Sequence, residues 1–140
     1  MGRICTNPHQ SNKLTSRGFS AKAADLWWSQ YELVYQPTPM MQHFVGDPVL
    51  YTYQTSSEDI PAWSLTTLLQ ALPDTISYDD EIFNLHITKA QNYYLVEYTS
   101  ERASLLYRDG RDLIDICVQV IIHLIDNDIP LNSAYLYDNI

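Results

Sequence analysis

The chain has 140 residues, 46% of them hydrophobic and 18% charged, a composition typical of a globular protein and not of a disordered one. No apolar run approaches the roughly 18 residues that a transmembrane helix needs. The formal net charge is −9, and no Lys or Arg occurs between Lys22 and Lys89, which argues against direct binding of DNA or RNA. We therefore expect one domain over residues 1–140, with neither membrane nor nucleic acid as a partner.

Two short helices are predicted near the N-terminus. Asn7 is placed to cap the first helix, with Pro8 at its first position and Gln10 completing a capping box. Gly18 is expected to end the turn that follows, and Ser20 to start the second helix. Residues 26–36 are rich in aromatic and β-branched side chains, which favours a short extended segment.

Residues 37–60 form the least regular part of the sequence. Proline and glycine residues interrupt them, and the alternation of Val49, Tyr51 and Tyr53 indicates one strand within the segment. A connection of this length in a compact domain is either functional or mobile.

A helix over residues 64–72 is predicted by a cap and by leucines at helical spacing. Ser64 occupies the cap position, and the leucines that follow form one apolar stripe. Trp63 directly precedes the cap and Leu68 lies four residues inside the helix, so the two are expected to pack as a hydrophobic staple. We interpret Trp63 as structural and not as a ligand-binding residue.

The second half of the chain alternates as β-strands do and ends in a long helix. Residues 82–88 and 92–99 form a predicted hairpin, and the stretches 75–78 and 103–108 are compatible with further strands. Asp109 is expected to cap a long helix. The apolar arc of this helix consists of Leu113, Cys117, Val120, Ile121 and Leu124. The sequence therefore predicts an α+β fold, with short N-terminal helices and a small antiparallel sheet packed against a long C-terminal helix.

The usual sequence motifs of catalysis, phosphate binding and metal binding are missing. No histidine has a second His or Cys at ligand spacing; the histidines are His9, His43, His86 and His123. Three carboxylates cluster at Asp79, Asp80 and Glu81, but they fall in a predicted turn. We therefore interpret them as a solvated acidic turn and not as a catalytic acid–base pair. We predict no catalytic residue, no cofactor site and no metal site.

The two cysteines, Cys5 and Cys117, are too few and too far apart to form a disulfide framework. We expect both to be reduced, with Cys117 on the apolar face of the long helix. The N-terminus also lacks the apolar core of a signal peptide. Together these features predict a cytoplasmic protein.

Tyrosine is the residue type in excess, with 11 in the chain. Neighbouring strand residues point to opposite faces, so some of the tyrosines of the β region must face outward, where they suit a partner surface. The C-terminal segment from Asn132 to Ile140 is also apolar enough to predict a contact, either within the chain or with a second copy. The predicted interaction surface comprises Tyr93, Tyr94, Tyr98, Tyr135 and Tyr137.

Three segments resemble a group of short uncharacterised proteins found in gut Bacteroidales genomes, their prophages and their mobile elements. The resemblance is carried by residues 6–28, by the Pro-Ala-Trp-Ser-Leu motif at residues 61–65, and by residues 111–129. It has no counterpart over residues 29–58. The resemblance implies a bacterial or phage cytosolic setting and no particular chemistry.

These observations favour a non-enzymatic interaction or accessory protein of a phage or mobile element, with a protein partner or a second copy of the chain. Two alternatives remain open. One is an acidic inhibitor that mimics nucleic acid, suggested by the span without cations. The other is an enzyme whose site is dispersed in the sequence, with His86, Asp79 and Asp80 as its candidates.

Overall fold

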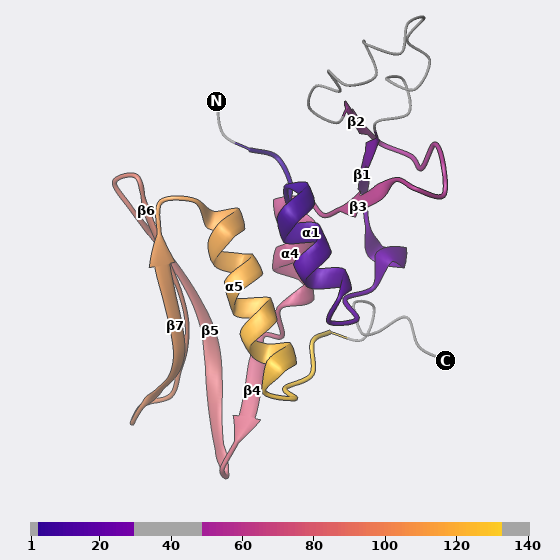
Figure 1. Ribbon diagram of the computed structural model, residues 1–140. Helices are drawn as coiled ribbons and strands as arrows, with labels where there is room; N and C mark the ends of the chain where they lie inside the picture. The colour runs from indigo at the N-terminus through magenta and orange to yellow at the C-terminus, as the bar shows by residue number, and fades with distance from the viewer. Residues whose placement is uncertain (1–2, 30–48, 133–140) are drawn as a thin grey trace, which may run out of the picture.

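The computed structural model describes residues 3–29 and 49–132 (Figure 1). Its helical elements are α1 (Pro8–Thr15), the 3-10 helix η1 (Ala21–Ala23), α4 (Leu65–Ala71) and α5 (Leu113–Asp126). An antiparallel sheet of order β2-β1-β3 contains β1 (Leu26–Ser29), β2 (Val49–Tyr51) and β3 (Ile60–Ala62). A second antiparallel sheet, of order β4-β5-β6-β7, contains β4 (Thr75–Tyr78), β5 (Glu81–Ala90), β6 (Tyr93–Thr99) and β7 (Ser104–Gly110). The predicted α+β class is confirmed.

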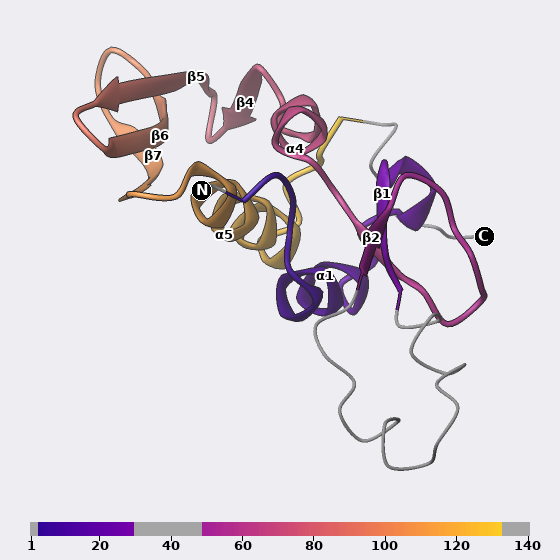
Figure 2. The same cartoon turned by 90° about the horizontal axis from the view of Figure 1, so that it is seen from above.

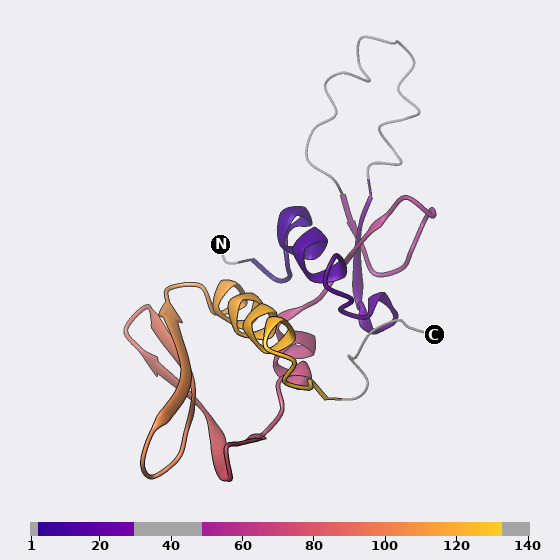
Figure 3. The same cartoon turned by 60° about the horizontal axis from the view of Figure 1, so that its bottom comes forward.

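The long C-terminal helix, α5, occupies the centre of the fold. It packs against β6 and β7 of the four-stranded sheet on one side and against α4 and α1 on the other (Figures 2 and 3). A helix covered on two sides needs apolar residues around most of its circumference. Its buried residues are accordingly more numerous than the predicted arc: Ile114, Ile116, Cys117, Val118, Val120, Ile121, Leu124 and Ile125.

The four-stranded sheet is a meander built from hairpins. The β4–β5 turn consists of Asp79 and Asp80, whose φ angles of 54° and 63° are both positive, as a type I′ turn requires. The β5–β6 turn places Asn92 at a φ of 51°. The side of the sheet that meets α5 is buried in the core through Ile76, Phe83, Val96, Tyr98 and Leu106.

The helix cap predicted at Asp109 is wrong, because β7 continues to Gly110 before α5 begins. Asp112 caps α5 instead, and its carboxylate accepts hydrogen bonds from two backbone N–H groups of the first turn. Asp109 is a strand residue whose carboxylate accepts a hydrogen bond from the Tyr93 hydroxyl.

The cap predicted at the start of α4 is confirmed, and the burial of Trp63 agrees with its predicted structural role. Trp63 and Leu68 are both fully buried in the same core cluster, and the Ser64 hydroxyl accepts a hydrogen bond from the Thr67 N–H at 3.3 Å. The Trp63 ring also packs edge-on against Phe19, with 4.8 Å between the ring centroids.

The N-terminal predictions are also confirmed. Asn7 and Gln10 form a capping box at the start of α1, and Ser20 caps η1. Gly18 has a φ of 88°, which favours glycine at the end of the α1 turn. The extended segment predicted at 26–36 is a strand over Leu26–Ser29, and its remainder lies outside the described residues.

The strand predicted within residues 37–60 is β2. It begins at Val49 as the alternation predicted but ends at Tyr51, before Tyr53, and β3 begins at Ile60, the last residue of the segment. Both pair with β1, which brings Trp27 opposite Tyr51 on one side and opposite Pro61 on the other.

Candidate functional site

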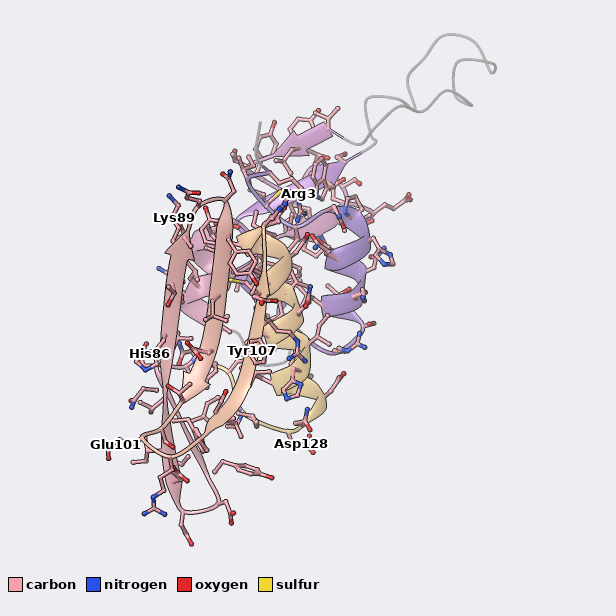
Figure 4. All side chains as sticks on the ribbon, turned by 90° about the vertical axis from the view of Figure 1, so that its left-hand side faces the viewer. Arg3, His86, Lys89, Glu101, Tyr107 and Asp128 are labelled. Atoms are coloured by element: carbon pink, nitrogen blue, oxygen red, sulfur yellow. The ribbon has the colours of Figure 1, made fainter. Side chains whose placement is uncertain are left out.

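The surface of the four-stranded sheet that faces away from α5 is covered by no element among the described residues. We call it the outer face. Figure 4 views the molecule from this side, with α5 behind the strands. Strand alternation and the observed registers assign to it Thr75, Ser77, Ile82, Asn84, His86, Thr88, Tyr93, Leu95, Glu97, Thr99, Tyr107 and Asp109.

Large apolar side chains on the outer face are unusually exposed. Ile82 is 60% exposed and Tyr107 is 56% exposed, and Tyr93 is exposed as well. The hydrogen bond from the Tyr93 hydroxyl to Asp109 is the main reason that the pKa of Tyr93 is raised, because it stabilises the protonated phenol. The outer face therefore presents aromatic rings that carry hydroxyl groups, a composition common in protein interfaces.

One row of outer-face residues crosses three strands. His86 on β5 pairs with Glu97 on β6, which pairs with Tyr107 on β7. Directly opposite residues in adjacent strands have Cβ atoms about 4.5 to 5.5 Å apart. The registers place an imidazole, a carboxylate and a phenol next to one another on an open surface, and Figure 4 shows His86 and Tyr107 at the two ends of the row.

The structure separates the tyrosines that the sequence grouped into one interaction surface. Tyr93 lies on the outer face, whereas Tyr94 points to the α5 side and packs partly buried against the core. The assignment of Tyr98 to the surface is wrong, because its side chain is fully buried and its hydroxyl donates to the Pro73 carbonyl at 2.7 Å. Tyr135 and Tyr137 lie outside the described residues.

Tyr107 and Ile82 belong to the outer face but were not among the predicted residues. The alternation of β6 contained the signal that identifies this face. Glu97 must point outward, so its neighbours Val96 and Tyr98 must point toward the core. Pairing β7 to β6 in that register then places Tyr107 beside Glu97.

The residues of the enzyme alternative do not meet. Asp79 and Asp80 occupy the tip of the β4–β5 hairpin, and His86 lies six residues beyond Asp80 on β5. Six strand residues span about 20 Å. No side chain contact can therefore join His86 to either carboxylate within one protein copy.

Two hollows adjoin the four-stranded sheet, and His86 lines neither. One, of about 930 Å³, lies at the tip of the β5–β6 hairpin and is open to solvent. The other, of about 210 Å³, lies between the start of β7 and the C-terminal half of α5. The second is smaller than the roughly 300 to 1,000 Å³ of pockets that enclose drug-sized ligands.

Among the described residues, the acidic side chains of the span without cations are dispersed, and several are engaged in the fold. The Asp25 carboxylate accepts hydrogen bonds from the Ser64 N–H at 2.9 Å and from the side chains of Ser64 and Thr67 at the start of α4. Asp59 closes a turn by accepting from Thr55, while other carboxylates lie at the distant β4–β5 turn. This scatter favours solubilising and structural roles over mimicry of a phosphate backbone.

Hydrogen bonds and burial shift the pKa values of Asp59 and of the two cysteines. Partial burial opposes the ionisation of Asp59, but donors from Thr55 and Ser56 outweigh it and lower the pKa of this carboxyl below 3.8. Burial raises the pKa of the Cys117 thiol to about 12 and, with help from the Asp25 carboxylate, that of Cys5 to about 11. Both cysteines are free and buried, so neither is presented as a nucleophile.

Several positions that carry the sequence resemblance join the helices to one another. Gln10 on α1 donates to the Asp115 carboxylate on α5 at 2.5 Å. The Ser11 hydroxyl is hydrogen-bonded to that of Thr6 at 2.8 Å inside the core. These residues act as structural connectors in this chain and mark no chemical site.

The segment after α5 docks on the end of α4. The Asn132 amide donates to the carbonyls of Gln70 and Leu72, and its N–H donates to the Ala71 carbonyl. Leu131 is buried beside it. The first residue of the predicted C-terminal contact is thus bound to the fold, and residues 133–140 lie outside the described part of the chain.

Within residues 3–29 and 49–132, no cluster of three or more His, Cys, Asp or Glu side chains is arranged to hold a metal ion. No helix in the same ranges is both long enough and apolar enough to cross a membrane. Comparisons with protein-family models, curated proteins and solved structures find no match to this chain.

Proposed function

We propose that the protein is a non-enzymatic interaction protein that binds a protein partner through the outer face. The observation that carries this proposal is the exposure of Ile82 and Tyr107 on a sheet face that no element within residues 3–29 and 49–132 covers. Water-exposed apolar and aromatic side chains of this size gain most when a partner buries them. Tyrosine also offers a hydroxyl to the partner at low entropic cost, because its ring has few rotatable bonds.

The proposed setting is the bacterial cytoplasm, with the protein encoded by a phage or mobile element. The resemblance of the Pro-Ala-Trp-Ser-Leu motif at residues 61–65 to short proteins of gut Bacteroidales genomes, prophages and mobile elements supports this setting. A nucleic-acid partner is not proposed, because Glu97 and Asp109 place negative charge on the outer face. Two of the eight cations are also neutralised in ion pairs, Arg3 with Asp112 at 3.0 Å and Arg17 with Asp126 at 3.1 Å.

The test compares two matched double variants in affinity capture from a Bacteroidales host lysate. The first, Ile82→Ser with Tyr107→Ser, removes the apolar side chains of the outer face. The control, Ile4→Ser with Tyr53→Ser, removes the same residue types at equal exposure elsewhere, since Ile4 is 61% and Tyr53 is 62% exposed.

We expect the wild type and the control to retain a common partner that the outer-face variant loses, with circular dichroism unchanged for all three. A partner retained by the outer-face variant contradicts the proposal. If sedimentation gives a doubled mass for the wild type and the control but not for the outer-face variant, the outer face binds a second copy of the chain instead.

A further inference from the structure

The edge of β5 that faces β4 is paired along less than half of its length. β4 pairs with residues 81–84, and one further bond joins the Leu85 N–H to the Asp74 carbonyl at 3.0 Å. Pro73, which has no N–H, then leads the chain away toward α4. We call the unpaired stretch at residues 86–90 the open edge.

The backbone groups that point out of the open edge can be identified from the register. The Leu85 N–H points toward β4, and successive strand residues alternate in direction, so Ile87 and Lys89 direct their N–H and C=O groups the same way. His86, Thr88 and Ala90 direct theirs toward β6. No strand in the described ranges pairs with Ile87 or Lys89 on the open side.

The side chains along the open edge are also uncovered. Ile87 and Lys89 lie on the α5 side of the sheet, but the main contacts of α5 with this sheet are to β6 and β7. Ile87 is 43% exposed, although strand alternation puts it on the same face as the buried Phe83. Lys89 lies at the far end of the same strand (Figure 4).

Two cations, Lys89 and Arg111, lie at this end of the sheet, while the neighbouring carboxylates of Asp109 and Asp112 are engaged by Tyr93 and Arg3. Lys89, Tyr94 and Gly110 form one row across β5, β6 and β7, and Arg111 follows directly. Arg111 and Tyr94 line the hollow at the hairpin tip. The ion pairs found among the described residues involve Arg3 and Arg17 and leave Lys89 and Arg111 without a carboxylate partner.

We infer that the open edge binds an extended acidic segment of a partner protein, which adds to the sheet as an antiparallel strand. The backbone groups of Ile87 and Lys89 supply the hydrogen bonds of strand addition. An acidic residue of the partner faces Lys89, and an apolar residue two positions later faces Ile87, because alternate residues share a face. The lysine disfavours apolar or basic strands, so it gives the edge its specificity.

This contact uses residues separate from the outer face and can be tested independently of the proposed function. The probe is the peptide acetyl-Thr-Thr-Glu-Thr-Val-Thr-amide, titrated into the ¹⁵N-labelled full chain. One control peptide carries Lys in place of Glu. A second carries N-methyl groups on the Glu and Val nitrogens, which face the edge in the inferred pairing and should be needed for binding. A third carries one N-methyl group on the Thr between them, whose nitrogen faces away from the edge, and should bind.

In the free protein we expect the amides of Ile87 and Lys89 to exchange rapidly with solvent, while those of His86 and Thr88 are protected. The Glu peptide should protect Ile87 and Lys89 and shift their resonances. Affinity should fall by roughly threefold to tenfold with the Lys peptide, as expected for one cross-strand charge pair. The variant Lys89→Glu should reverse this preference, and the outer-face double variant should bind as the wild type does.

Four results would overturn the inference. Protection of the Ile87 and Lys89 amides in the free chain at every concentration means that the edge is already covered. Protection that rises with protein concentration assigns the edge to a second copy. Equal binding of the Glu and Lys peptides would mean that charge does not select the partner strand. Full binding of all N-methylated peptides would mean that backbone strand pairing does not hold the peptide.

Discussion

Thr6 and Trp63 tie the N-terminal segment to the start of α4 through two hydrogen bonds. The Thr6 N–H donates to the Trp63 carbonyl at 3.0 Å, and the Trp63 N–H donates to the Thr6 hydroxyl oxygen at 3.2 Å. The Trp63 ring lies fully inside the core, where it meets Phe19. Trp63 thus connects a segment that is distant in sequence to the central helices.

Trp63→Ala should lower the free energy of unfolding by about 3 to 5 kcal/mol, because the substitution leaves a large cavity in the core. Trp63→Phe should cost roughly half as much, since it keeps an aromatic ring against Phe19. It also removes an indole N–H that has no hydrogen-bond partner among the described residues. Urea denaturation measures both effects, and an unchanged midpoint for Trp63→Ala would return this residue to the candidate binding sites.

Asp80→Gly should raise the free energy of unfolding by roughly 0.5 to 1 kcal/mol. Asp80 has a φ of 63° in the β4–β5 turn, a conformation that glycine adopts without steric cost. Asp80→Val at the same position should destabilise, because a β-branched side chain resists positive φ. Thermal melting of the pair provides the measurement, and a lower melting temperature for Asp80→Gly would disprove the turn type.

Neither cysteine should react with Ellman's reagent at pH 8 in the native protein. Burial raises the pKa of the Cys117 thiol to about 12 and that of Cys5 to about 11, so the reactive thiolate is scarce. Both thiols should react at once in about 6 M guanidinium chloride, which serves as the control for their number. Rapid native labelling of either residue would contradict its burial.

Asp59 should make stability fall as the solution becomes acidic. Its folded pKa lies below 3.8, so its stabilising contribution is complete above the unfolded value and is lost as pH falls through the folded one. The difference in unfolding free energy between wild type and Asp59→Asn should therefore be constant above about pH 5 and shrink below about pH 4. A difference that stays constant down to the acid-unfolding region would contradict the stabilising role of the Asp59 carboxylate.

Local patterns predicted the helices well because caps and staples act within a few residues. The capping box of Asn7, the staple of Trp63 and the β5–β6 hairpin all follow from short-range spacing. The misplaced cap shows the limit of this reasoning. Asp109 and Asp112 are equally good caps by residue type, and only the register that extends β7 opposite Tyr94 decides between them.

Long-range contacts could not be predicted in the same way. The pairing of Trp27 with Pro61 joins distant segments and has no local sequence signal. The sequence shows apolar residues around most of α5, but it contains no signal that α1 and α4 cover the side of this helix that faces away from the sheet. The alternation of β6 indicates that Tyr98 points inward and Glu97 outward, but no local sequence signal shows that the described elements leave the outer face uncovered.

Photo-crosslinking tests the proposed interaction function most directly. Benzoylphenylalanine replaces Tyr107 on the outer face or, as the control, Tyr53, which is exposed to a similar extent, 62% against 56%. The full chain is then irradiated inside a Bacteroidales host. We predict a discrete crosslinked product with one protein from position 107 and none from position 53. The absence of any product from position 107, or the same product from both positions, would contradict binding through the outer face.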